Sequence, residues 1–153
     1  MTSALLLAAA VELAVPFVPQ EKDTCGAAAL AMVLAYWGEP VPHDEIAGAL
    51  LEPERRGIRG ARLESFARAR GLLAVAYEGD LGQLRDFVAK GRPLVVAWKQ
   101  AGRFHDVVVV GFDRDAVVVH DPEAGAGRRV PLRAFEERWT GAGRWTLLVL
   151  PRP

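Results

Sequence analysis

The sequence has little of what usually marks a metal centre, a charged partner or a membrane protein. Among its 153 residues is a single cysteine, Cys25, which excludes an internal disulfide and any site with two thiolate ligands. Nineteen basic residues balance nineteen acidic ones, so the formal net charge is zero and nothing suggests binding to nucleic acid or anionic membrane. No run approaches the roughly 18 apolar residues of a transmembrane helix. We therefore expect no metal, no cofactor, no nucleic-acid partner and no membrane span.

The N-terminal residues allow two interpretations. Residues 4–11 are apolar and end in small side chains, as the tail of a secretory signal would. However, no lysine or arginine precedes Lys22, whereas a signal peptide starts with positive charge. A first strand or helix of the domain is the other interpretation, and the compartment stays open between cytoplasmic and exported.

The rest of the chain is rich in apolar residues arranged as helices and then strands. With 51% hydrophobic residues it can bury a substantial core, and we expect residues 1–153 to form one domain. Helical patterns dominate the first half and strand patterns the second, which favours an α+β fold with two lobes. The predicted helices cover residues 27–37, 45–51, 62–70, 81–90 and 131–139, and the predicted strands cover residues 72–77, 94–98, 105–112, 116–121, 128–130 and 145–150.

Cys25 stands at the start of the most apolar predicted helix. Asp23 and Thr24 are residue types whose side-chain oxygens cap helix N-termini, and Gly38 supplies a left-handed stop. Residues 27–37 carry no charge, so this helix belongs in the core. The N-terminal end of a helix favours a thiolate over a thiol, although a lone cysteine can also be an inert buried residue.

The chain also contains the other groups that cysteine catalysis needs. A nucleophilic thiolate works with an imidazole, a group that orients the imidazole, and donors for the oxyanion. His105 opens one predicted strand, and Asp121 closes the next because Pro122 prevents its continuation. Gln20 lies five residues before Cys25 and can offer a side-chain N–H beside the backbone N–H of Cys25.

Strand register decides whether His105 and Asp121 can meet. Directly opposed residues of an antiparallel hairpin point to the same face of the sheet. His105 and Asp121 both have odd numbers, so they share a face only if the hairpin loop contains an odd number of residues. A three-residue loop over residues 113–115 would place Val107 opposite Asp121. His105 would then be a diagonal neighbour of Asp121, about 7–8 Å away and within side-chain reach. The site therefore predicts an odd loop or a bulge.

Structural roles are expected for the other residues that could be considered for the catalytic site. Asp106 should point to the opposite side of the strand from His105. His120 should be a partly exposed sheet residue. Trp98 ends a strand that approaches His105 and is the one tryptophan expected to line a cleft. The charged residues of the segment 52–60 are expected to form a solvated loop.

Three segments in chain order resemble the double-glycine, bacteriocin-processing cysteine peptidases, which are papain-like enzymes. These are residues 20–38 (QEKDTCGAAALAMVLAYWG), 105–113 (HDVVVVGFD) and 119–122 (VHDP). The resemblance implies a helical N-terminal lobe with a buried central helix, an antiparallel C-terminal sheet lobe and a cleft between them. It also implies that Cys25 is the nucleophile, His105 the general base and acid, Asp121 the orienting carboxylate and Gln20 an oxyanion donor.

The resemblance further implies peptide cleavage through a thioester, commonly after a Gly-Gly pair in a leader peptide. Many members are N-terminal domains of peptide-exporting ABC transporters, whereas this chain looks free-standing, with a peptide substrate and any export system separate. Asp106 stands where an apolar or aromatic residue is common, which predicts a more acidic cleft wall. A peptide-binding module that does not cut, an acyltransferase using the same thioester, and a purely structural thiol remain alternatives.

Overall fold

The computed structural model describes residues 10–153, which form five α-helices and a seven-stranded antiparallel sheet. The elements in order are β1 (Val11–Glu12), α1 (Cys25–Tyr36), α2 (His43–Leu50), the 3₁₀ turn η1 (Pro53–Arg55), α3 (Gly60–Ala69), β2 (Leu73–Glu78), α4 (Leu81–Ala89), β3 (Leu94–Gln100), β4 (Arg103–Phe112), β5 (Ala116–Asp121), β6 (Gly125–Pro131), α5 (Leu132–Gly141) and β7 (Trp145–Leu150). Most of the apolar stretch 4–11 lies outside the described residues. None of the described helices is long and apolar enough to cross a bilayer.

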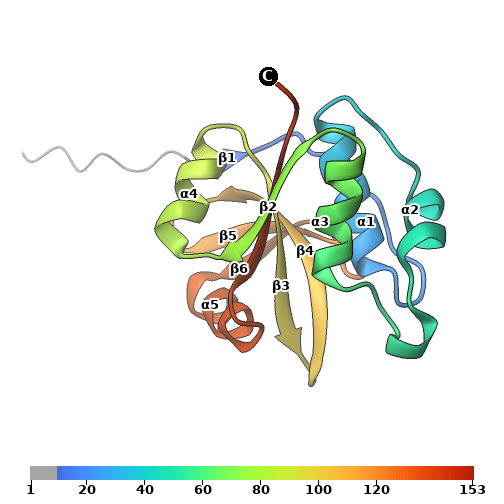
Figure 1. Ribbon diagram of the computed structural model, residues 1–153. Helices are drawn as coiled ribbons and strands as arrows, with labels where there is room; N and C mark the ends of the chain where they lie inside the picture. The colour runs from blue at the N-terminus through green and yellow to red at the C-terminus, as the bar shows by residue number, and fades with distance from the viewer. Residues whose placement is uncertain (1–9) are drawn as a thin grey trace, which may run out of the picture.

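The sheet separates two groups of helices. Its strands lie in the order β2-β7-β3-β4-β5-β6, and β1 pairs with β4. Helices α1, α2 and α3 lie together on one side, and α4 and α5 lie on the other (Figure 1). The predicted α+β fold with a helical lobe and an antiparallel sheet is confirmed. Helices α4 and α5 belong with the sheet because each buries an apolar stripe, including Leu84 and Trp139, in a hydrophobic cluster of the sheet that is distinct from the cluster around α1.

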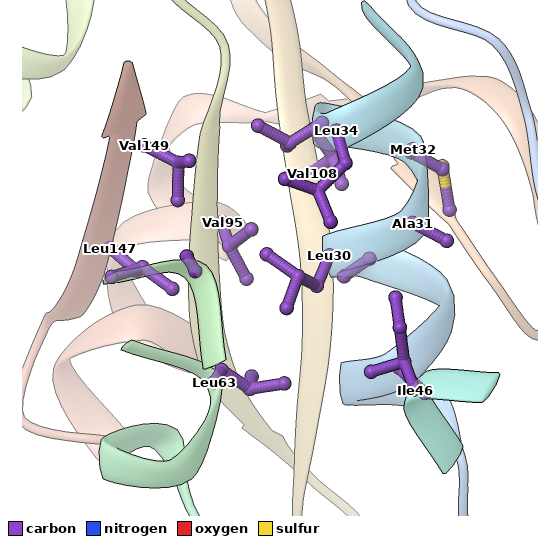
Figure 2. Packing of buried hydrophobic residues seen from close by; sticks show 14 of the residues in the cluster. Leu30, Ala31, Met32, Leu34, Ile46, Leu63, Val95, Val108, Leu147 and Val149 are labelled. Carbon is purple, nitrogen blue, oxygen red and sulfur yellow. The ribbon is translucent and has the colours of Figure 1, made fainter. Parts of the chain in front are cut away.

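Helix α1 forms the centre of the helical lobe. Every residue from Gly26 to Leu34 is buried, as the uncharged sequence predicts. Figure 2 shows Leu30 between α1 and the strand that carries Val108, with Leu63 of α3 and Ile46 of α2 around the same core. Burial on all sides fixes the position of the first turn of α1, and therefore of the residue that starts it.

The turn before α1 differs from the predicted cap. Asp23 adopts a left-handed conformation with φ of 60°, and the side chain of Thr24 caps no N–H of α1. Instead the Thr24 hydroxyl donates to the carbonyl of Glu21 and accepts from its N–H, both at 2.9 Å. The hydroxyl closes the preceding turn, so the first N–H groups of α1 receive no side-chain cap.

The β4–β5 hairpin contains the predicted bulge rather than the three-residue loop. Asp113 donates its N–H to the carbonyl of Ala116 at 3.0 Å, so two residues separate this pair. The carboxylate of Asp113 also accepts from the N–H groups of Asp115 and Ala116, which stabilises the tight turn. The register then shifts between Val109 and Gly111.

The bulge gives the alignment that an odd loop would have given. Val108 pairs with His120, so continuing the ladder by one residue places Val107 opposite Asp121. His105 is then the diagonal neighbour of Asp121 on the same face. The backbone therefore brings the imidazole and the carboxylate together.

Candidate active site

His105 and Asp121 form a direct, buried pair. His105 Nε2 lies 2.6 Å from Asp121 Oδ1, and the two residues are only 6% and 7% exposed. The same Oδ1 accepts from the N–H groups of Glu123 at 2.9 Å and Ala124 at 3.2 Å. These bonds hold the carboxylate at the end of β5, so it can fix the orientation of the ring.

Cys25 completes the cluster from the other lobe. Its half-buried side chain, on the first residue of α1, lies close enough to His105 to help raise the pKa of the imidazole. Because Nε2 of the ring faces Asp121, Nδ1 is the nitrogen left for the sulfur. The structure thus brings together three predicted residues that are separated by up to 96 positions in the sequence.

The neighbours of His105 favour its charged form. Burial acts to lower the pKa of His105, but the hydrogen bonds and negative charges of Asp121 and Cys25 outweigh it and raise the pKa to about 10. Burial acts to raise the pKa of Asp121, and its hydrogen bond and ion pair with His105 hold the pKa below its ordinary value. The ring is therefore an imidazolium near neutral pH.

Gln20 lies beside the turn that follows Asp121. Its backbone N–H donates to the carbonyl of Pro122 at 3.0 Å. Its side-chain Oε1 is the one buried side-chain oxygen or nitrogen without a hydrogen-bond partner among residues 10–153. This oxygen is an acceptor, whereas the proposed oxyanion donor is the amide nitrogen of the same side chain.

His120 has a structural role, but the predicted partial exposure is wrong. The residue is 6% exposed, and its Nε2 donates to the carbonyl of Val15 at 2.8 Å. Nδ1 accepts from the N–H of Gly127 at 3.0 Å. Val15 and Phe17, in the segment preceding Cys25, contact the ring, which the strand pattern alone could not reveal.

A cavity of about 700 Å³ opens beside Cys25. Its lining includes Arg55, Arg56 and Arg59, so the segment 52–60 is not merely a solvated loop but forms one wall. Trp145 lines the same cavity, whereas Trp98 borders a separate one of about 360 Å³ next to Asp121. The roles of these wall residues could not be predicted from the sequence because they depend on how the two lobes pack together.

Asp106 also lines the cavity beside Cys25. It faces α1, away from His105 as predicted, and a Cβ atom placed on Gly26 would lie only 2.9 Å from its Oδ2. Gly26 therefore leaves the space that the carboxylate occupies. Burial raises the pKa of Asp106 to about 6, although the positive charge of His105 acts to lower it. The expected acidic residue in the cleft wall is present.

This raised pKa gives a testable dependence of stability on pH. Because the pKa is about 6 in the folded protein and 3.8 ordinarily, the folded state holds the proton more tightly. The resulting stabilisation is complete below about pH 4 and is lost as the pH rises to about 6. We expect the Asp106→Asn variant, compared with wild type, to lose less stability between pH 4 and pH 7 in urea unfolding. Asp115→Asn, in an exposed turn, is the control; equal pH dependence in all three proteins would contradict the assignment.

Comparison with known proteins identifies the family. A sequence model of the Peptidase_C39 like family matches residues 12–146. The chain belongs to the Peptidase_C39 like family. This C39-like chain is 32% identical over 134 residues to the transport/processing ATP-binding protein ComA of Streptococcus pneumoniae, covering 84% of the chain and 18% of ComA. The match thus spans less than a fifth of that relative's length.

Solved structures agree with the family. A double glycine motif protease from an AMS/PCAT transporter, in complex with its leader peptide, is 29% identical with a TM-score of 0.76, covering 93% of the C39-like chain and 95% of that protease. A C39-like peptidase from Bacillus anthracis shares the fold, with 21% identity and a TM-score of 0.82 over 94% of this chain and 98% of that one. The predicted family and papain-like fold are confirmed, and family membership supports a cysteine peptidase function.

Proposed function

We propose that this protein, one papain-like domain over residues 1–153, is a cysteine peptidase that cleaves peptide bonds through a thioester. Cys25 is the nucleophile, His105 the general base and acid, and Asp121 the orienting carboxylate. Gln20 and the backbone N–H of Cys25 are the oxyanion donors. The observation that carries the proposal is the position of His105, whose Nε2 lies 2.6 Å from Asp121 and whose ring is near enough to Cys25 for the thiol to help raise its pKa.

Each step uses a group already in place. The thiolate of Cys25 attacks the scissile carbonyl, and the negative charge that forms on its oxygen meets N–H donors at the start of α1 and on Gln20. His105 gives its proton to the leaving amine, which breaks the C–N bond and leaves a thioester. The neutral ring then takes a proton from water, which attacks the thioester and releases the acid and the thiolate. No metal or cofactor enters these steps.

The proposed substrate is a leader-type peptide cut after Gly-Gly. Support comes from the similar protease that is described as a double glycine motif enzyme bound to a leader peptide, and from the similarity to ComA, a transport/processing protein. ComA extends far beyond the matched region, and we propose that this domain works together with a peptide export system.

Cleavage of a synthetic leader peptide containing Gly-Gly tests this function. We expect mass spectrometry to show two fragments, with a new carboxylate on the second glycine, and no cleavage of a matched peptide with Leu-Leu at the bond. An intact peptide that nevertheless binds would support the non-cleaving module instead. A product with an amine joined to the new carbonyl would indicate acyl transfer.

A further inference from the structure

The cavity beside Cys25 is lined by arginines from two parts of the fold. Arg55, Arg56 and Arg59 come from the segment between α2 and α3, and Arg103 comes from the start of β4. The chain as a whole carries no net charge. Positive charge is therefore concentrated around the one opening that contains the thiol.

Only part of this charge is neutralised within the protein. Glu52 faces three guanidinium groups: Arg59 at 2.9 Å, Arg55 at 3.4 Å and Arg62 at 3.7 Å. The hydrogen bond from Arg59, with the charges of all three arginines, holds the pKa of Glu52 below its ordinary value against a smaller effect of burial. One carboxylate shared by three arginines leaves two positive charges without a partner.

The other two arginines of the lining differ from each other. Arg103 pairs with Asp23 at 3.2 Å. Arg56 has no carboxylate within 4 Å among the described residues, and it is exposed in a left-handed turn with φ of 53°. Its guanidinium is therefore available to a ligand. Arginine matches a carboxylate with two parallel hydrogen bonds, which a lysine cannot offer.

Asp106 is the only carboxylate among the described residues that line this cavity, and the Cys25 thiolate is the other negative group there. That carboxylate lies against the first turn of α1, close to Gly26. Ile58 and Trp145 supply apolar surface in the same lining. The lining thus offers guanidinium groups around a partly apolar space, with its single carboxylate held at the helix.

We propose that this cavity binds a segment of the peptide substrate that carries carboxylates close to the scissile bond. The proposal rests on the proposed function, because the ligand is a peptide only if Cys25 attacks one. Guanidinium groups that line the same cavity as the thiol would raise the local concentration of an acidic segment and orient it. A basic segment would meet the same positive charge as repulsion.

Charged thiol reagents test the electrostatics without requiring any cleavage. The anionic 2-sulfonatoethyl and the cationic 2-(trimethylammonio)ethyl methanethiosulfonates both form a mixed disulfide with Cys25 and release methanesulfinate. For Cys25, we compare the rate constant of the anionic reagent with that of the cationic reagent. We expect this ratio to be roughly 10-fold higher than the same ratio for the small, neutral thiol compound N-acetylcysteinamide at low salt, and to fall as the salt concentration rises. A ratio equal to that of the free thiol would overturn the proposal.

Variants locate the effect. Arg56→Glu and Arg59→Glu should each lower the ratio several-fold, and Asp106→Asn should raise it. Arg114→Glu is the matched control, because Arg114 is an exposed arginine in the turn at the opposite end of β4. An equal fall in Arg114→Glu and Arg56→Glu would assign the effect to net charge and contradict a local site.

Peptide substrates then show whether the cavity binds side-chain or C-terminal carboxylates of the peptide. We expect wild type to show a lower KM for a peptide with glutamates beside the scissile bond than for its glutamine counterpart, and Arg56→Glu to remove this difference with little change in kcat. Both peptides are made with a free and with an amidated C-terminus, which separates side-chain from terminal carboxylates. A high reagent ratio without cleavage would refute the peptidase function, and with it a peptide substrate as the ligand, while leaving an anion-binding cavity. Cleavage with a free-thiol ratio would refute the anion-binding cavity and leave the peptidase function.

Discussion

Replacement of Cys25 by alanine is expected to lower the rate of peptide cleavage by about 10⁴-fold or more, to the background of the assay. The thiol is the only group in the cluster that can form the thioester, since the chain has no other cysteine. The small change of volume at a half-buried position should leave the fold intact. Initial rates on the leader peptide, followed by chromatography, measure the effect.

His105→Ala provides the companion test. If the proposed catalytic residues act as a unit, this variant should lose nearly as much activity as Cys25→Ala, and the double variant should lose little more. Circular dichroism and the urea midpoint show whether each protein is folded. Activity of a folded Cys25→Ala variant within tenfold of wild type would exclude the thioester mechanism.

Replacement of Asp121 by alanine is expected to reduce kcat by about 10³–10⁴-fold. The change removes the partner of His105 Nε2 together with the acceptor of two backbone N–H groups in the following turn. It also removes a negative charge that raises the pKa of His105 to about 10, so this pKa should fall. The alkaline limb of the pH–rate profile should therefore move to lower pH.

Asp121→Asn separates orientation from charge. The amide oxygen can still accept from the backbone N–H groups of Glu123 and Ala124, so the turn should survive. We expect a smaller loss of kcat than in Asp121→Ala but a similar shift of the alkaline limb. If the alkaline limb of the pH–rate profile lies at the wild-type pH in both variants, the carboxylate of Asp121 does not set the charge of His105.

The elements with strong apolar patterns could be placed from the sequence. Strands β5 and β7 begin and end at the predicted residues, because apolar runs stop there at turn residues or proline. By contrast, β6 runs over Gly125–Pro131 and not only over residues 128–130. It is a mostly exposed edge strand rich in glycine and arginine, so no hydrophobic alternation marks its length.

The pairing of His105 with Asp121 could also be anticipated, because strand parity and hairpin geometry are local properties. The residues that line the cavity could not be predicted in this way. Arg56 and Trp145 belong to segments nearly 90 positions apart, and they meet only because α3 packs against the sheet beside β7. Likewise, Thr24 closes its own turn rather than capping α1, a choice between two local hydrogen bonds that residue type does not decide.

The place of β7 has a consequence for how the protein matures. This strand, the last one of the sheet in chain order, lies between β2 and β3 rather than at an edge. Until residue 150 has been synthesised, β2 cannot join the remaining strands, and α3 lacks part of the surface it packs on. A nascent chain therefore contains its thiol well before the groove around it exists, so the proposed peptidase activity must wait for synthesis and folding to finish.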